Sequence, residues 1–200
     1  MDNHHYLVAK SNKGYGVLGE EGVVIIPIYD KITLNIEGLR QCCLVFVLEK
    51  DGLTGIYSER GKPILDVEYN ELKTYGYNFF PSSYSSFLIV SKNDKVGFFD
   101  IENNSFVLPV EYDNIAIETD DYKEAIVLNV EKNNKVGLFD TRTFKEILPL
   151  EFDKIELWQD YYVDYVEDRI YKVKKNNLSG IFNVTNKKFI LQPKYSKINI

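Results

Sequence analysis

The sequence predicts an all-β protein built from five tandem repeats of about 41 residues, each a three-stranded antiparallel unit. The first observation is a glycine that recurs every 39 to 43 residues, at Gly16, Gly55, Gly97, Gly137 and Gly180. The second is an aromatic residue that follows each glycine, at Tyr29, Tyr69, Tyr112, Phe152 and Tyr195. The third is that no stretch combines helical apolar spacing with caps at both ends. We therefore expect units that bury their apolar faces against one another.

Each repeat opens with a short apolar strand, rich in β-branched residues, that runs into a tight polar turn. The turns hold Asn12-Lys13-Gly14, Asp51-Gly52, Asn93-Asp94, Asn133-Asn134 and Asn176-Asn177. Such pairs between apolar runs indicate two-residue β-hairpin loops, because type I′ turns need a positive φ at both central positions.

The second strand of each repeat carries the recurring glycine, which in a strand indicates a bulge or a close approach of two backbones. A second polar turn follows, at Glu20-Glu21-Gly22, Glu59-Arg60-Gly61, Asn103-Asn104 and Asn186-Lys187. We expect the third strand to end near a proline, which has no N–H to donate to a ladder, at Pro27, Pro109, Pro149 and Pro193.

The repeats, at about 6–43, 44–86, 87–124, 125–169 and 170–200, form a single domain over residues 1–200. The segment 156–171 has aromatic residues at a spacing that fits one or two helical turns, but it lacks a cap, and we interpret it as a linker. An open stacked array is slightly favoured over a closed five-bladed propeller-like ring, because a propeller blade usually has four strands. The intact terminal repeats, which lack polar caps, favour closure or a homodimer through the repeat ends.

Composition narrows the classes of function. A chain of 200 residues with 44% hydrophobic residues can bury a core, and it has no apolar run long enough for a transmembrane helix. The N-terminus does not resemble a signal peptide, and the adjacent Cys42 and Cys43 are interpreted as reduced thiols, so we expect a cytoplasmic protein unless a signal has been removed. The net charge of −6 argues against nucleic acid as a partner, and we expect no membrane partner either.

Three segments carry a motif that resembles the bacterial WG-repeat family across essentially the whole chain. They are Gly14-Tyr-Gly-Val-Leu with Pro27-Ile-Tyr-Asp-Lys-Ile, Lys95-Val-Gly-Phe-Phe-Asp with Pro109-Val-Glu-Tyr-Asp-Asn-Ile, and Lys135-Val-Gly-Leu-Phe-Asp with Pro149-Leu-Glu-Phe-Asp-Lys-Ile. The tryptophan that names the family is replaced before each glycine, by Tyr15, Thr54, Val96, Val136 and Ser179. The resemblance therefore implies a divergent member, and it implies a binding or scaffold role with little chemistry.

Catalytic and metal-binding patterns are missing from the sequence. The only histidines, His4 and His5, lie in the N-terminal tail, and there is no phosphate-binding loop or paired metal-ligand motif. We expect a protein that is not an enzyme and that has no cofactor and no metal site. A polar residue follows the aromatic at Asp30, Asn70, Asp113, Asp153 and Ser196, and an Asx turn at the strand end explains it better than calcium does.

Three inter-repeat segments, 73–86, 117–124 and 156–171, do not repeat and are rich in aromatic and acidic residues. Equivalent loops of a repeat array fall on one edge, and tyrosine and tryptophan are favoured at interface hot spots. The candidate partner-binding residues are Tyr75, Tyr77, Phe79, Asp120, Asp121, Trp158, Asp160, Tyr161 and Tyr165. The alternative is that these rings fold back over the array as core.

The leading hypothesis is a non-enzymatic protein-binding module, such as an inhibitor or immunity protein for a basic partner, because acidic residues among the aromatics would steer such a partner. The alternative is a carbohydrate-binding, lectin-like repeat protein, in which aromatic rings stack on sugars. Equivalent sugar sites should recur in every repeat, whereas the exposed-looking aromatics are concentrated in two segments.

Overall fold

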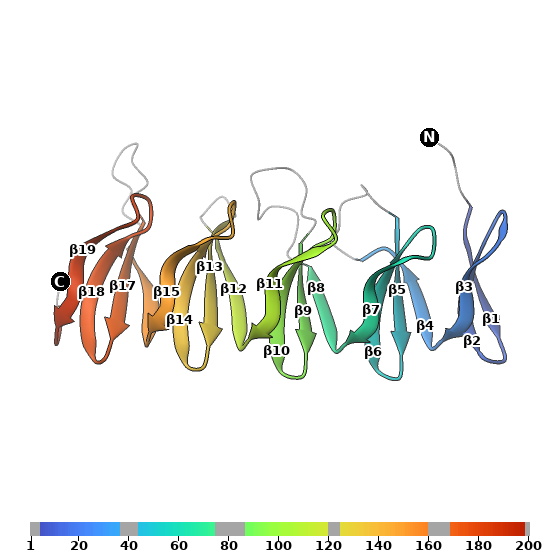
Figure 1. Cartoon of the computed structure of the whole chain (residues 1–200), viewed down its shortest axis with the longest axis horizontal. Coiled ribbons are helices and arrows are strands. Elements are labelled where there is room, and N and C mark those ends of the chain that lie inside the picture. The colour runs from blue at the N-terminus through green and yellow to red at the C-terminus, as the bar shows by residue number, and fades with distance from the viewer. Residues whose placement is uncertain (1–4, 37–43, 75–86, 120–124, 160–168, 199–200) are drawn as a thin grey trace. The chain divides into compact units, whose positions relative to one another are not determined.

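The computed structural model describes residues 5–36, 44–74, 87–119, 125–159 and 169–198. These residues form five separate antiparallel sheets (Figure 1). No sheet of the described residues closes into a barrel, which is consistent with an open repeat array. The contacts divide the chain into two compact units, Met1–Val110 and Glu111–Ile200, and each is described by itself.

The first unit holds three sheets. The first sheet contains β1 (Leu7–Ser11), β2 (Gly14–Gly19) and β3 (Gly22–Tyr29) in that order. The second sheet contains β4 (Lys31–Leu34), β5 (Val45–Lys50), β6 (Leu53–Ser58) and β7 (Pro63–Tyr69). The third sheet contains β8 (Glu71–Thr74), β9 (Phe87–Lys92), β10 (Lys95–Asp100) and β11 (Ser105–Tyr112), and the unit boundary falls inside β11.

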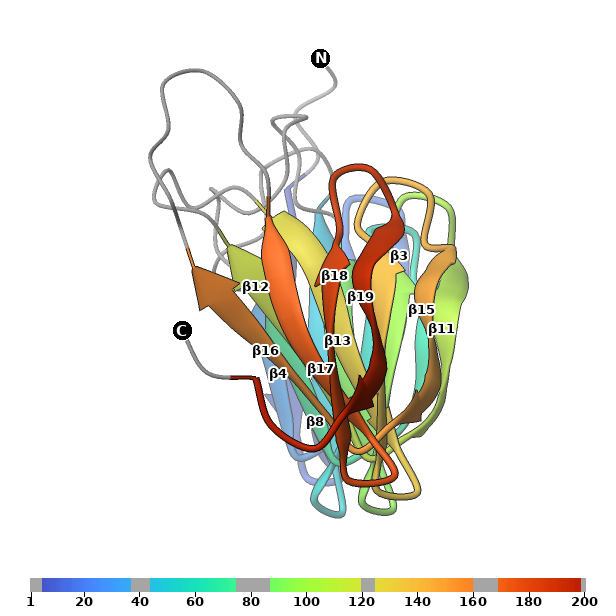
Figure 2. The same cartoon turned by 90° about the vertical axis from the view of Figure 1, so that its left-hand side faces the viewer.

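The second unit holds two four-stranded sheets. The fourth sheet contains β12 (Asn114–Thr119), β13 (Ala125–Lys132), β14 (Lys135–Asp140) and β15 (Glu146–Phe152). The fifth sheet contains β16 (Lys154–Gln159), β17 (Ile170–Lys175), β18 (Leu178–Asn183) and β19 (Lys188–Tyr195). In Figure 2 its strands, coloured orange to red, lie nearest the viewer. The described residues form no helix, and so none that could cross a membrane.

A fourth strand, which the sequence analysis does not expect, completes four of the five described sheets. It begins two residues after the repeated aromatic, as Lys31 does after Tyr29, and it belongs to the sheet of the following repeat. The chain therefore passes from one sheet to the next across a single residue such as Asp30. The expectation of a linker over 156–171 is wrong at both ends, because 156–159 lie in β16 and 170–171 lie in β17.

The hairpin turns follow the prediction in four repeats. Asn93 and Asp94 have φ values of 51° and 58°, and the turn pairs at 51–52, 133–134 and 176–177 likewise have positive φ. These are the angles that type I′ turns require. The turn at 12–14 differs, because there only Gly14 has a positive φ, and the backbone N–H of Lys13 donates to Ser11 Oγ.

The recurring glycine faces a bulge in the third strand of its own sheet. Val136 pairs with Phe152 and Leu138 with Leu148, so the residues 149–151 lie opposite Gly137 alone. A Cβ at Gly137 would come within 2.8 Å of the Leu148 carbonyl oxygen. The predicted close approach and bulge are thus both confirmed. The expectation that the proline ends the third strand is wrong, because the bulge absorbs Pro149 and β15 continues to Phe152.

An apolar layer lies between successive sheets within each unit. Val17 and Tyr29 of the first sheet pack with Phe46 and Leu48 of the second. The second and third sheets share a similar cluster around Tyr69 and Leu88, and the fourth and fifth share one around Phe152 and Tyr171. The repeated aromatic is therefore a core residue in the first four repeats, whereas Tyr195 in the fifth is 47% exposed.

Candidate functional site

The three variable segments occupy the same topological position in their sheets. The residues 75–86 connect β8 with β9, 120–124 connect β12 with β13, and 160–168 connect β16 with β17. Each therefore joins the first strand of a four-stranded sheet to the second. The connection at 35–44, between β4 and β5, is equivalent to them, but it contains no aromatic residue and so carries no such signal in the sequence.

Most of the predicted partner-binding residues lie outside the residues that the structure describes. These are Tyr75, Tyr77, Phe79, Asp120, Asp121, Asp160, Tyr161 and Tyr165. Trp158 is described, and it lies in β16 as a half-buried strand residue. Its neighbour Leu157 is 40% exposed, so this strand presents apolar side chains beside the connection that follows it.

A partly buried polar network supports the strands beside two of these connections. The fully buried Tyr171 of β17 donates its hydroxyl hydrogen to Glu118 Oε2 of β12 at 2.6 Å. The amide Nδ2 of Asn129, in β13, donates to Glu118 Oε1 at 3.0 Å. Glu118 therefore ties the fourth sheet to the fifth, because its two carboxyl oxygens accept hydrogen bonds from residues of both sheets. The sequence offered no signal for this pair, whose members are separated by 53 residues.

The repeated acidic residue after the aromatic is used by the scaffold. Asp30 Oδ2 accepts a hydrogen bond from the backbone N–H of Asp51 at 2.7 Å. Its equivalents accept from the next hairpin turn in the same way: Asn70 from Asn93 (2.9 Å), Asp113 from Asn133 (2.6 Å) and Asp153 from Asn176 (2.7 Å). The expectation of an Asx turn is wrong in one respect: the side chain does accept from a backbone N–H, but 20 to 23 residues away, at the hairpin of the sheet that the chain enters.

A lysine, a glutamate and the repeated aromatic meet where successive sheets join. Lys92 Nζ lies 2.8 Å from Glu68 Oε2 and 5.6 Å from the centre of the Tyr69 ring. The same contact recurs in Lys132 with Glu111 (2.8 Å) and Tyr112 (5.4 Å), and in Lys175 with Glu151 (2.6 Å) and Phe152 (5.9 Å). The hydrogen bond from Lys92 holds the pKa of Glu68 below its ordinary value of 4.5. These ion pairs therefore help to join one repeat to the next.

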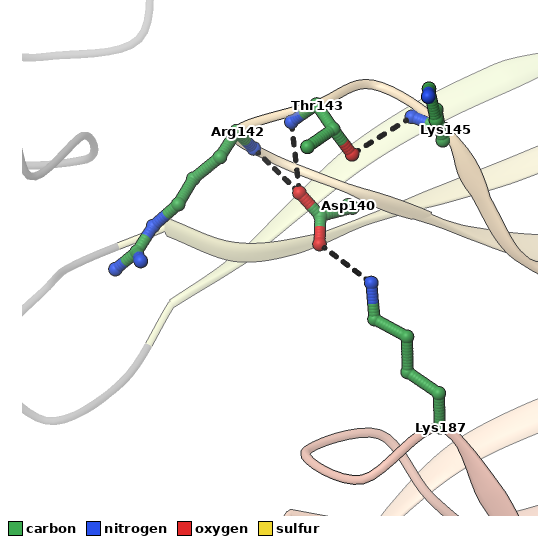
Figure 3. Close-up of polar contacts among 5 residues, drawn as sticks. All are labelled: Asp140, Arg142, Thr143, Lys145 and Lys187. Atoms are coloured by element: carbon green, nitrogen blue, oxygen red, sulfur yellow. Dashed lines mark hydrogen bonds and ion pairs between the residues drawn. The ribbon is translucent and has the colours of Figure 1, made fainter.

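The second turn of the fourth sheet is organised by Asp140 (Figure 3). Its Oδ1 accepts from the backbone N–H groups of Arg142 (3.0 Å) and Thr143 (2.9 Å), and its Oδ2 lies 3.3 Å from Lys187 Nζ of the fifth sheet. Burial acts to raise the pKa of Asp140, but these donors outweigh it and the pKa is lowered. The group stays ionised at neutral pH and joins neighbouring turns.

Three buried tyrosines of the described residues have pKa values raised by their surroundings. Burial, followed by the hydrogen bond to Tyr57, raises the pKa of Tyr29 to about 12, so this phenol stays protonated. Tyr69 and Tyr112 have raised pKa values, also chiefly because of burial. Within the described ranges, no group of three or more His, Cys, Asp or Glu residues is placed to hold a metal ion.

Comparison with known proteins adds little to this picture. No family model and no curated protein matches the chain. One similar solved structure is the crystal structure of the eukaryotic initiation factor, with a TM-score of 0.36 and 12% sequence identity. The match covers 92% of this chain and 49% of that chain, so the present chain spans about half of its length. A similarity this weak carries no conclusion, and the architecture rests on the strands themselves.

Proposed function

We propose that this chain is a non-enzymatic protein-binding module that presents the connections between the first and second strands of its sheets to a basic protein partner. The observation that carries the proposal is the contrast between these connections and the rest of each repeat. The variable segments share one topological position, whereas the repeated polar residues are engaged in fastening one sheet to the next. In repeat proteins, variation confined to equivalent connections is typical of a binding surface.

The charge of the chain supports a basic partner. The net charge is −6, and the connections contain Asp120, Asp121 and Asp160 beside Trp158 and Tyr161. Acidic groups around aromatic anchors accelerate association with a basic surface, and this effect weakens as salt rises. An inhibitor or immunity protein for a basic toxin is one concrete form of this function. The repeated Tyr-Asp-x-Ile element, which also carries the sheet crossings, supports membership of the WG-repeat family.

The decisive experiment captures partners from a lysate of the source cells at low salt on the immobilised chain. The parent is compared with Asp120→Lys/Asp121→Lys and with Tyr161→Ala/Tyr165→Ala. We expect a basic protein that the parent retains and both variants lose, and its binding should fall steeply as salt is added.

Matched controls distinguish a loss of binding at the connections from a general effect of charge or of a lost aromatic ring. Glu20→Lys/Glu21→Lys produces the same change in net charge in an exposed turn of the first sheet. Tyr195→Ala removes a ring that is 47% exposed and lies outside the connections. Both controls should keep the partner. The proposal would be ruled out if every variant captured the same protein as the parent. It would also be ruled out if the parent captured no protein and bound glycan-coated beads instead.

A further inference from the structure

One face of the first sheet is apolar and exposed. Leu7, Leu18 and Val23 are 68%, 39% and 61% exposed, and they lie side by side because Leu7 pairs with Leu18 and Leu18 pairs with Val23. We call these three residues the head face. Aligned apolar side chains on an exposed sheet face are characteristic of an interaction surface.

The following sheets bury the position of Leu7, whereas the position of Val23 stays exposed in two of them, at Pro63 and Glu146. Phe46, Leu88 and Tyr171 occupy the register position of Leu7, each paired with the residue two places after the repeated glycine, and all three have 0% exposure. Each of them packs against the sheet that precedes it in its unit. Leu7 thus occupies a position that packs against a preceding sheet wherever such a sheet is present in the unit.

The fifth sheet exposes the complementary surface. Tyr195 is 47% exposed, whereas its equivalents Tyr29, Tyr69 and Phe152 are 7%, 8% and 1% exposed and pack against the following sheet. Ile190 is 53% exposed, and its equivalents Val24, Ile64 and Ile147 also pack in those layers. We call Ile190 and Tyr195 the tail face.

We propose that the tail face of one copy of this chain packs on the head face of a second copy, reproducing the junction between successive sheets. The contact joins two different surfaces of identical chains, so it is heterologous and leads to chains or rings of copies. It uses described residues outside the partner-binding connections, and it stands or fails independently of the proposed function.

The exposed edge of the first sheet supports the same junction between copies. β5, β9 and β17 each pair on one side with the strand that enters from the preceding repeat, whereas β1 is an edge strand of the first sheet. Ser196, Lys197 and Ile198 repeat the pattern of Asp153, Lys154 and Ile155, the residues at which the chain passes into the fifth sheet. Lys197 and Ile198 of one copy are therefore placed to extend the first sheet of the next, because an exposed edge strand is a template for pairing.

Two departures from the repeat pattern agree with this contact. Lys194 replaces the glutamate found at Glu68, Glu111 and Glu151, and Ser11 replaces the lysine found at Lys92, Lys132 and Lys175. In the proposed junction Lys194 comes opposite Ser11. Had only the glutamate changed, two lysines would face each other, and like charges in an interface are unfavourable.

The test measures the molar mass of the full chain by analytical ultracentrifugation over a range of protein concentrations. We expect the mass of the parent to rise with concentration beyond that of a monomer. Leu18→Lys, on the head face, and Tyr195→Lys, on the tail face, should each stay monomeric, because each lacks one of the two surfaces. An equimolar mixture of the two variants should form dimers and nothing larger, since one intact pair of faces remains.

Controls keep the result interpretable. Leu178→Lys alters a leucine that is 38% exposed, nearly the same as Leu18, but lies beside a hairpin turn outside both faces, and it should assemble like the parent. Leu7→Lys serves as a second head-face variant if Leu18→Lys proves unfolded by circular dichroism. Ser11→Lys should weaken association about two- to fivefold, and adding Lys194→Glu should restore it.

Three results would overturn the proposal. The first is a parent that remains monomeric at all concentrations. The second is assembly that head-face variants abolish and that the tail-face variant leaves intact, which indicates a symmetric head-to-head dimer. The third is a mixture of the two variants that stays monomeric, which shows that the two faces do not bind each other.

Discussion

The first sheet and the sheets that follow it place the same register position in opposite environments. Leu7 is 68% exposed, whereas Phe46, Leu88 and Tyr171 at the equivalent position are fully buried. All four belong to the same kind of strand, paired through the same register with the strand that carries the glycine. The difference shows that, in a repeat protein, the neighbouring repeat and not the strand itself determines whether a side chain is core.

The largest expected effect tests this comparison at the repeated aromatic. Phe152→Ala should lower the free energy of unfolding by about 3–5 kcal/mol, because it leaves a cavity between two packed sheets. Tyr195→Ala, at the same position but 47% exposed, should cost less than about 1 kcal/mol. Urea unfolding at low protein concentration, where copies do not associate, measures both. Similar losses for the two variants would contradict the view that the following sheet makes this position a core position.

A second prediction concerns the close backbone contact at the recurring glycine, which should not depend on the neighbouring repeat. An added Cβ would come within 2.6 Å of the Ile25 carbonyl oxygen at Gly16 and within 2.8 Å of that of Leu148 at Gly137. Both contacts lie inside a single sheet. Gly16→Ala and Gly137→Ala should each destabilise the protein by about 1–3 kcal/mol, because the third strand must shift. Thermal unfolding of both variants checks this, and a loss confined to Gly137→Ala would show that the constraint depends on neighbouring sheets.

A third prediction separates the hydrogen bond of the buried Tyr171 from the packing of its ring. Tyr171→Phe removes the hydrogen bond to Glu118 and keeps the ring in its layer. We expect a loss of about 1–2 kcal/mol, because the carboxylate loses a donor inside the protein. The double variant Tyr171→Phe/Glu118→Gln should lose less than the sum of the two single variants. Additive losses, measured by chemical unfolding, would show that the two side chains do not act together.

The smallest expected effect concerns pH. The pKa of Glu68 is lowered by the hydrogen bond from Lys92, so the unfolded state binds protons more readily than the folded state. The stabilisation from this group is present above its ordinary pKa and is lost as pH falls through the lowered folded pKa. Glu68→Gln should therefore flatten the decline of stability between neutral and acidic pH, most clearly at low salt.

The matched variant for this measurement is Lys194→Gln, because Lys194 occupies the position of Glu68 in the last repeat. Because that variant leaves the contact between Glu68 and Lys92 in place, the part of the acid decline that this contact causes should persist. An unaltered acid decline in Glu68→Gln would show that its contact with Lys92 contributes nothing to stability.

Much of the local structure could be predicted from neighbouring residues in the sequence. The Asn-Asn and Asp-Gly pairs specify positive φ, and the recurring glycine specifies a close approach of two backbones, because both are steric properties of a few adjacent residues. The fourth strand of the four-stranded sheets could not be predicted in this way. Its sequence, such as Lys31 to Leu34, is short, and nothing in it says that it joins the following sheet and not the preceding one.

The candidate site, too, could be predicted from the sequence only in part. The sequence located the variable segments by their failure to repeat, and the structure adds that they share one topological position. Asp30 and Glu118 were beyond sequence reasoning, because their partners lie 21 and 53 residues away and the pairing depends on how sheets stack.

The sequence by itself therefore determined the period, the turns and the glycine bulge, because their steric causes lie within single hairpins. Only the tertiary structure decided which sheet each short strand joins and which equivalent residues are buried. It also left Leu7 and Tyr195 exposed where Phe46 and Phe152 are core. The reason is that burial is a property of two surfaces, and the second surface lies in another repeat.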